Sequence, residues 1–125
     1  MSYTIRVVQT VSEGSTSLSS TTNTIVEGCD KRNETIVDAA SEYNVVIGID
    51  VSSLKVFSMK SSQVLTVKTN SSGSPQETFT LVAGRPIVWQ EGDAAIFAGD
   101  VTGLYVSNAS GNDAVLEIIS ATDTP

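Results

Sequence analysis

The stretch "DVTGLYVSN", residues 100–108, is preceded at a distance of fifty residues by "DVSSLKVFS", residues 50–58. Both contain D-V-[S/T]-x-L-x-V, and each is followed by a turn and a second apolar run, "VLTV" from Val64 and "VLEI" from Val115. Leucine and valine two positions apart lie on the same face of a strand. We therefore expect residues 54–69 and 104–119 to be two equivalent antiparallel hairpins, with Leu54, Val56, Leu104 and Val106 buried.

The repeated aspartates, Asp50 and Asp100, allow two interpretations. As turn residues, their carboxylates would accept hydrogen bonds from backbone N–H groups two positions on. As a functional pair, they would serve acid–base chemistry or bind a cation, but neither has a histidine or the ligand spacing of a calcium loop. The pattern favours a structural role for both residues.

The rest of the chain predicts an all-β, single-domain β-sandwich that is jelly-roll-like, spanning residues 1–125. About nine or ten short antiparallel strands are separated by turn signals, the cadence of a sandwich. Strands are expected near residues 3–11, 24–27, 34–40, 44–51, 54–59, 64–69, 77–82, 87–90, 104–108 and 114–121, and residues 94–98 are a short apolar run. Residues 28–33 are expected to form a turn, and a short helix at residues 34–43 is the competing interpretation. Residues 1–23 are interpreted as an extended arm or edge strand plus a polar segment, with loop and strand both open for residues 12–23.

The charge balance restricts the partners of the protein. The chain has 14 acidic and 7 basic residues, a net charge of −7. Nucleic-acid binding requires clustered basic residues, so we expect neither nucleic acid nor an anionic membrane as a partner. The single cysteine, Cys29, excludes an internal disulfide bond. The N-terminus lacks the pattern of a signal peptide, so synthesis in a cytoplasm is expected.

The sequence contains no recognisable catalytic or metal-binding motif. The chain has no histidine, the commonest general base and metal ligand, and no G-x-S-x-G elbow. One cysteine without histidine makes a zinc site untenable. We therefore predict no catalytic residues, no metal and no cofactor, and a protein that is not an enzyme.

A weak candidate for a partner interface comprises two groups of residues. The first is at the N-terminus and the second surrounds the only tryptophan: Tyr3, Ile5, Arg6, Val7, Trp89 and Gln90. Trp89 and Phe79 are interpreted first as core anchors. The alternative places Trp89 at an interface, where tryptophan is a favoured anchor.

Two stretches carry a family resemblance: "VLTVKTNSSGSPQETFTLVAGRPIVW", residues 64–89, and "DVTGLYVSNASG", residues 100–111. Over residues 45–119 the chain resembles small β-rich virion proteins of tailed bacteriophages, encoded near the major capsid protein. The resemblance implies a capsid decoration (cement) protein on the outer surface of the head, synthesised in the host bacterial cytoplasm. It also implies the major capsid protein and further copies of the chain as partners, with a trimer favoured. The alternative is a tail or neck structural protein, or a receptor- or carbohydrate-binding β-sandwich module.

Overall fold

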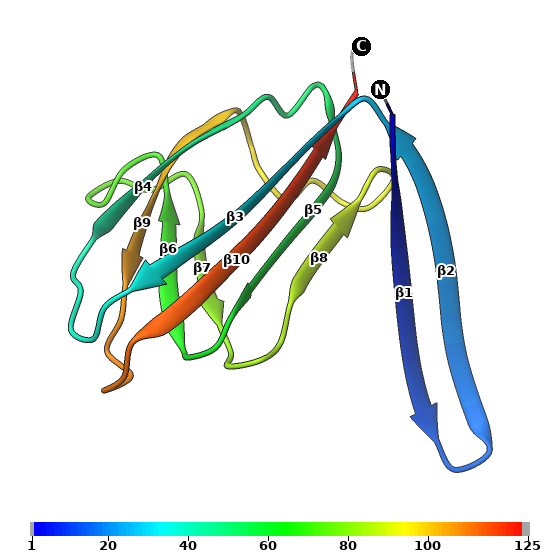
Figure 1. Ribbon diagram of the computed structural model, residues 1–125, viewed down its shortest axis with the longest axis horizontal. Helices are drawn as coiled ribbons and strands as arrows, with labels where there is room; N and C mark the ends of the chain where they lie inside the picture. The colour runs from blue at the N-terminus through cyan, green and yellow to red at the C-terminus, as the bar shows by residue number, and fades with distance from the viewer. Residues whose placement is uncertain (1, 124–125) are drawn as a thin grey trace.

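The computed structural model describes residues 2–123, which form ten β-strands and no helix (Figure 1). The expectation of an all-β protein with about ten strands is confirmed. The strands are β1 (Tyr3–Glu13), β2 (Thr16–Val26), β3 (Gly28–Ile36), β4 (Tyr43–Ile49), β5 (Leu54–Ser61), β6 (Leu65–Thr69), β7 (Thr78–Leu81), β8 (Ile87–Gln90), β9 (Val101–Ser107) and β10 (Ala114–Thr122).

Eight of the ten strands form a sandwich of two four-stranded antiparallel sheets. The β8 sheet has the order β3-β10-β5-β8, and the β7 sheet has the order β4-β9-β6-β7. Four connections cross from one sheet to the other: β3 to β4, β5 to β6, β7 to β8 and β9 to β10. Each joins strands at the same position in the two sheet orders, so the two sheets enclose a common core. This strand order is that of a jelly roll, a double sheet built from two Greek keys. The expectation of a jelly-roll-like sandwich is therefore correct.

The two repeated segments are not hairpins, and this expectation is wrong. β5 pairs with β10 and β8, whereas β6 lies in the other sheet and pairs with β9 and β7. β9 and β10 are likewise divided between the two sheets. The two units pair with each other, β5 with β10 and β6 with β9. Two strands joined by a turn can pair with each other as a hairpin, or they can lie in opposite sheets of the sandwich. In both cases alternate side chains face the core, so the strand–turn–strand pattern in the sequence does not distinguish the two arrangements.

The burial predicted from the repeat is nevertheless confirmed. Leu54, Val56, Leu104 and Val106 are all buried. The expected shared face is correct for Leu104 and Val106 but wrong for the first repeat, because Leu54 belongs to the main core and Val56 to a separate cluster outside it. At the centre of the sandwich, the ring of Phe57 meets the ring of Phe97 edge to face at 5.1 Å between centroids. The sandwich thus has an ordinary apolar core between its sheets.

Several local expectations also differ from the structure. Residues 28–33 belong to strand β3 and are not a turn. The competing helix at residues 34–43 is absent, because β3 continues to Ile36 and the chain then turns. Ala39 and Glu42 adopt positive φ angles of 65° and 53° in that turn. A right-handed helix cannot include such residues.

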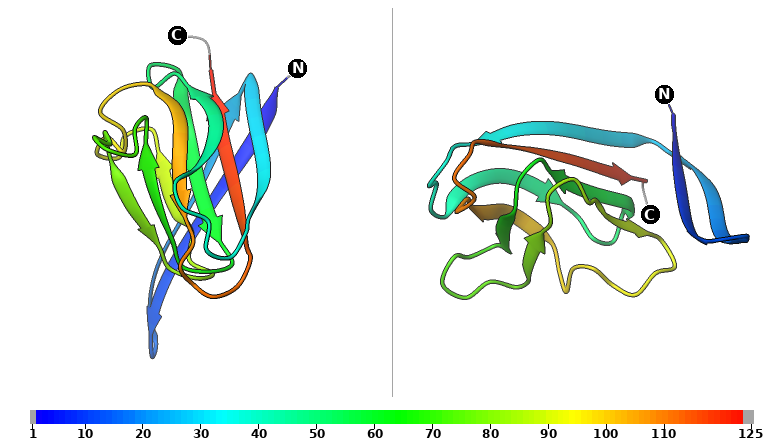
Figure 2. Two further views of the ribbon diagram at one scale, coloured as in Figure 1. Left: turned by 90° about the vertical axis from the view of Figure 1, so that its left-hand side faces the viewer. Right: turned by 90° about the horizontal axis from the view of Figure 1, so that it is seen from below.

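Residues 12–23, left open between loop and strand, form most of the outer part of a long hairpin. β1 and β2 pair in continuous register from Tyr3↔Val26 to Glu13↔Thr16. Gly14 in the connecting turn has a φ of 56°, a conformation that favours glycine. In Figure 2 this hairpin stands apart from the two stacked sheets, joined to them at its base. The interpretation of residues 1–23 includes Met1, which lies outside the described residues.

Candidate interaction surface

The base of the β1–β2 hairpin packs against the outer face of the β8 sheet. Val26, Val56 and Ala121 form a small buried apolar cluster, and Ile5 and Val7 pack onto it half-buried. Val56 and Ala121 are on the side of β5 and β10 that faces away from the main core. The hairpin therefore covers one end of a sheet face that would otherwise be exposed.

The tip of the hairpin extends beyond this contact. Val11 and Leu18 are direct cross-strand partners, so their side chains lie side by side on one face of the ribbon. They are 73% and 71% exposed. Ile5, Val7 and Val11 occupy alternating positions of β1 and therefore share a face. The face that packs against the sheet at the base continues to the tip without a covering element.

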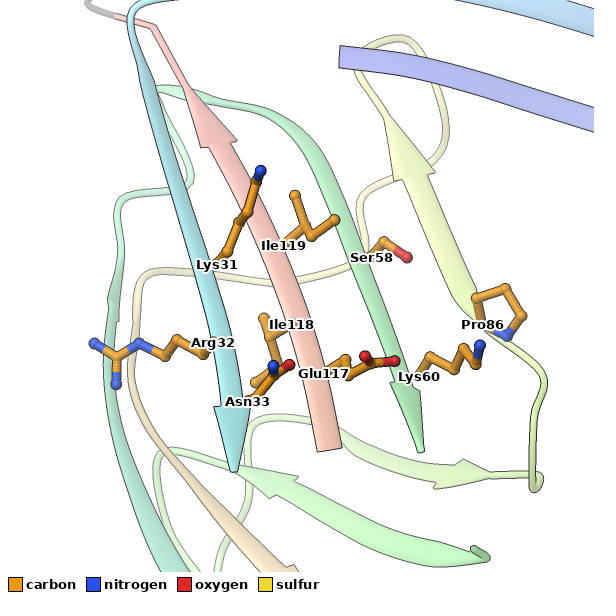
Figure 3. Close-up of a pocket in the computed structure, with 9 residues that line it drawn as sticks. All are labelled: Lys31, Arg32, Asn33, Ser58, Lys60, Pro86, Glu117, Ile118 and Ile119. Carbon is orange, nitrogen blue, oxygen red and sulfur yellow. The ribbon is translucent and has the colours of Figure 1, made fainter. Parts of the chain in front are cut away.

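The outer face of the β8 sheet also contains a groove of about 320 Å³, shown in Figure 3. Its floor is formed by β3, β10, β5 and the start of β8. The lining residues are Lys31, Arg32, Asn33, Ser58, Lys60, Pro86, Glu117, Ile118 and Ile119. Glu117 and Ile119 are exposed, whereas Leu116 and Ile118, between and beside them in β10, are buried in the core. The groove thus lies on the solvent side of the sheet, next to the hairpin base.

The groove has a basic rim in an acidic protein. Lys31 is the cross-strand neighbour of Ile119, and Lys60 is the cross-strand neighbour of Glu117. Among the described residues, neither lysine has a carboxylate within 4 Å. The electrostatic character of this face therefore differs from that of the chain as a whole, whose net charge is −7.

Arg32 contributes little charge to the groove. In Figure 3 its side chain extends to the other side of β3 from Lys31 and Lys60. Its guanidinium donates one hydrogen bond to Asp30 (3.1 Å) and one to the carbonyl oxygen of Val46 in β4 (2.6 Å). Arg32 thus connects the edges of the two sheets.

The structure brings three of the predicted interface residues together at the hairpin base. Ile5, Arg6 and Val7 line a second groove, of about 210 Å³, between β1 and the β8 sheet. The opposite wall includes Val88 and Ile119. Tyr3 stands at the start of β1 and is exposed.

The other two predicted interface residues differ in orientation. Trp89 points between the sheets, packs against the main core and donates an indole hydrogen bond to the carbonyl oxygen of Ala94 (3.0 Å). Gln90 is half-buried opposite Val56, near the hairpin base. Trp89 therefore has the environment of a core anchor.

Asp50 and Asp100 stabilise the same turn. Asp50 Oδ1 accepts hydrogen bonds from the backbone N–H and the hydroxyl of Ser52, at 3.0 and 2.7 Å. Asp100 Oδ1 accepts a hydrogen bond from the backbone N–H of Val51 (3.0 Å). The turn interpretation is correct for Asp50. Asp100 instead connects the second repeat to the first, a contact that local sequence does not indicate.

Within residues 2–123, no three histidine, cysteine, aspartate or glutamate side chains gather in a way that could hold a metal ion. The same part of the chain contains no helix able to cross a membrane. Its cysteine, Cys29, is half-buried in β3.

Sequence reasoning missed the residues of the groove and of the hairpin tip. Residues Glu13, Leu18, Lys31, Lys60 and Ile119 were not singled out, because each lies in an ordinary polar or alternating stretch. The available signals were that Lys31 belongs to the only basic pair of the sequence, Lys31-Arg32, and that Ile119 lies in a predicted strand. Which strands are neighbours is decided by the jelly-roll pairing.

Comparison with known proteins gives little. No protein-family profile matches the chain, and no curated protein matches it. Among solved structures, it is similar to a chain from work described as "Bacillus endospore appendages form a novel family of disulfide-linked pili". That likeness has a TM-score of 0.39 and 12% identity, and it covers 78% of this chain and 88% of the other. Similarity of this size establishes neither a shared fold nor a shared function.

Proposed function

We propose that this protein is a structural component of a tailed-bacteriophage virion, a decoration protein that binds the assembled head shell and stabilises it. In this proposal it is not an enzyme. The observation that carries it is the combination of a sandwich with a projecting hairpin whose apolar tip, Val11 and Leu18, is left exposed by the other described residues. A subunit of an assembly requires such a combination, since a rigid body fixes position and a projecting element reaches a neighbour.

Two further features support the proposal. The chain resembles small β-rich phage virion proteins over residues 45–119. Jelly rolls recur in viral capsid proteins and also in lectins, an argument at the level of fold alone.

The mechanism is thermodynamic. A protein that binds only the assembled shell adds its binding free energy to the intact state, as a ligand stabilises the fold it binds. The major capsid protein would be the shell partner. Self-association, with a trimer favoured, would multiply weak contacts through avidity.

The test is to mix purified protein with phage capsids that lack it, assembled from the proposed partner, the major capsid protein. We expect co-sedimentation in a fixed ratio to the capsid protein and a higher rupture temperature. Absence of binding, together with localisation to the tail, would overturn the proposal in favour of a tail or receptor-binding role.

A shortened-arm variant connects the proposal to the hairpin. Val8 and Thr21 are cross-strand partners, so residues 9–20 can be replaced by Asn-Gly, a two-residue hairpin turn. We expect this variant to fold as the parent does, as judged by circular dichroism, and to bind capsids more weakly. Unchanged binding would show that the arm has no part in the assembly.

A further inference from the structure

The distal half of the β1–β2 hairpin has exposed apolar side chains that the other described residues do not cover. A two-stranded ribbon is marginally stable in water by itself. Near the base, Ile5 and Val7 have the body of the protein to pack against. At Val11 and Leu18 no element within residues 2–123 covers the apolar pair, whose members are 73% and 71% exposed. Another molecule packed on the exposed face of the ribbon at Val11 and Leu18 would bury these side chains and stabilise the distal half of the hairpin.

The tip face has a definite chemistry. Glu13 follows Val11 by two positions in β1 and so lies on the same face, close to the turn. The face therefore presents two aliphatic side chains, Val11 and Leu18, and one carboxylate, all exposed. Of the residues between Val7 and Thr24, Glu13 is the only charged one.

The groove on the β8 sheet has the complementary chemistry. Ile119 and Pro86 provide apolar surface, and Lys31 and Lys60 provide positive charge without a partner within 4 Å among the described residues. The groove also contains one carboxylate, that of Glu117, so the two lysines leave it with an excess of positive charge. In Figure 3 the two lysines lie on either side of the groove, with Ile119 beside Lys31 and Pro86 beside Lys60.

An existing contact shows which surface the hairpin face fits. At the base, this face already packs on Val56 and Ala121, which belong to the outer face of the same sheet. Ile119 is two positions from Ala121 in β10 and on the same side. The groove thus continues the surface that the hairpin covers within its own chain.

We propose that the groove of each molecule receives the hairpin tip of a second copy of this chain. Val11 and Leu18 of one copy pack on Ile119 and Pro86 of the next, and Glu13 pairs with Lys31 or Lys60. Donor and acceptor are different surfaces, so successive contacts of this kind generate a closed ring when the rotation between copies closes. The contact would provide the self-association invoked above, but it is tested without capsids.

The first experiment measures the oligomeric state of the purified protein over a range of concentrations by sedimentation velocity. We expect a closed oligomer, and we expect Leu18→Glu and Ile119→Glu each to weaken its association at least tenfold. Ile25→Glu and Val46→Glu are the matched controls. These residues are 68% and 69% exposed, and they lie on the other face of the hairpin and on the other sheet. A monomer at all concentrations, or equal sensitivity to the control substitutions, would overturn the proposal.

A charge exchange tests the ionic part of the contact. Glu13→Lys should weaken association, and combining it with Lys31→Glu and Lys60→Glu should restore most of the loss. Absence of any restoration would contradict the assigned pairing. Circular dichroism and the melting temperature of each variant separate loss of contact from loss of fold.

A cross-link identifies the contact directly. In a Cys29→Ser background, one sample carries Leu18→Cys and the other Ile119→Cys. Mixed and oxidised, they should yield a disulfide-linked dimer of the two chains in preference to either homodimer. A statistical mixture of dimers would overturn the proposal. Capsid binding by a protein that fails these tests would leave the proposed virion function intact.

Discussion

Strands β10 and β1 both direct successive side chains to opposite faces, yet the side chains on corresponding faces differ in burial. In β10 every inward-facing side chain from Ala114 to Ser120 is buried between two sheets. In β1 the same alternation leaves Ile5 and Val7 half-buried and Val11 exposed. Alternation therefore determines which face of a strand is apolar, but burial requires a second layer opposite that face.

The difference divides the molecule into a body stabilised by its core and an arm stabilised only at its base. Substitutions should accordingly have effects on the free energy of unfolding that diminish from the core of the sandwich to the tip of the hairpin. Four substitutions test this gradient.

The largest effect is expected for Phe57→Ala. Phe57 is fully buried and its ring contacts Phe97, so the substitution should reduce the free energy of unfolding by about 3–5 kcal/mol. Urea unfolding followed by Trp89 fluorescence measures the change. Tyr43→Ala, at an exposed position of β4, is the control. A similar small loss for both would mean that the core does not lie where the structure places it.

The next effect is expected for Asn108→Ala. The buried amide of Asn108 donates hydrogen bonds to the carbonyl oxygens of Ile36 (2.9 Å) and Asn112 (2.8 Å), and its oxygen accepts one from Ser110 N–H (3.0 Å). Removing the amide leaves these groups without partners, at a cost of about 1–3 kcal/mol. The same unfolding experiment measures it. Asn33→Ala, at an exposed position of β3, should change stability far less.

A smaller effect is expected for Ile5→Ser at the base of the hairpin. Ile5 is only half-buried against Val26 and its neighbours, so the loss should be about 1 kcal/mol. Hydrogen exchange gives the clearer measurement. Amides of β1 and β2 should exchange faster, whereas those of β10 should be unaffected. Faster exchange in both regions would show that arm and body unfold together.

The smallest effect on stability is expected for Leu18→Ser at the tip. Because Leu18 is 71% exposed and pairs across the ribbon with Val11, which is itself 73% exposed, the free energy of unfolding of the monomer should change by less than about 0.5 kcal/mol. The measurement is thermal unfolding at a concentration low enough to suppress association. A large loss here would indicate that the tip packs on its own sandwich, and the division into arm and body would be wrong.

The candidate site was only partly predictable. Ile5, Arg6 and Val7 were identified from the sequence as interface candidates, and the structure places them together at the hairpin base. The groove was not foreseen, since Lys31, Lys60 and Ile119 come from three strands far apart in the chain. For Trp89 the first interpretation, a core anchor, agrees with the structure, since its side chain packs against the main core.

The sequence by itself determined the all-β class, the approximate number of strands and the apolar face of the second repeated segment, because each follows from local alternation and turn residues. It did not determine the face of Val56, which is buried away from the main core that contains Leu54. Only the tertiary structure decided that β5 and β6 lie in different sheets and that β5 pairs with β10. It also decided that residues 12–23 continue as a projecting ribbon. Side-chain alternation has the same period in a hairpin and in a crossing between sheets. The choice between them depends on which distant strand completes the hydrogen bonds at each edge, and no single segment contains that information.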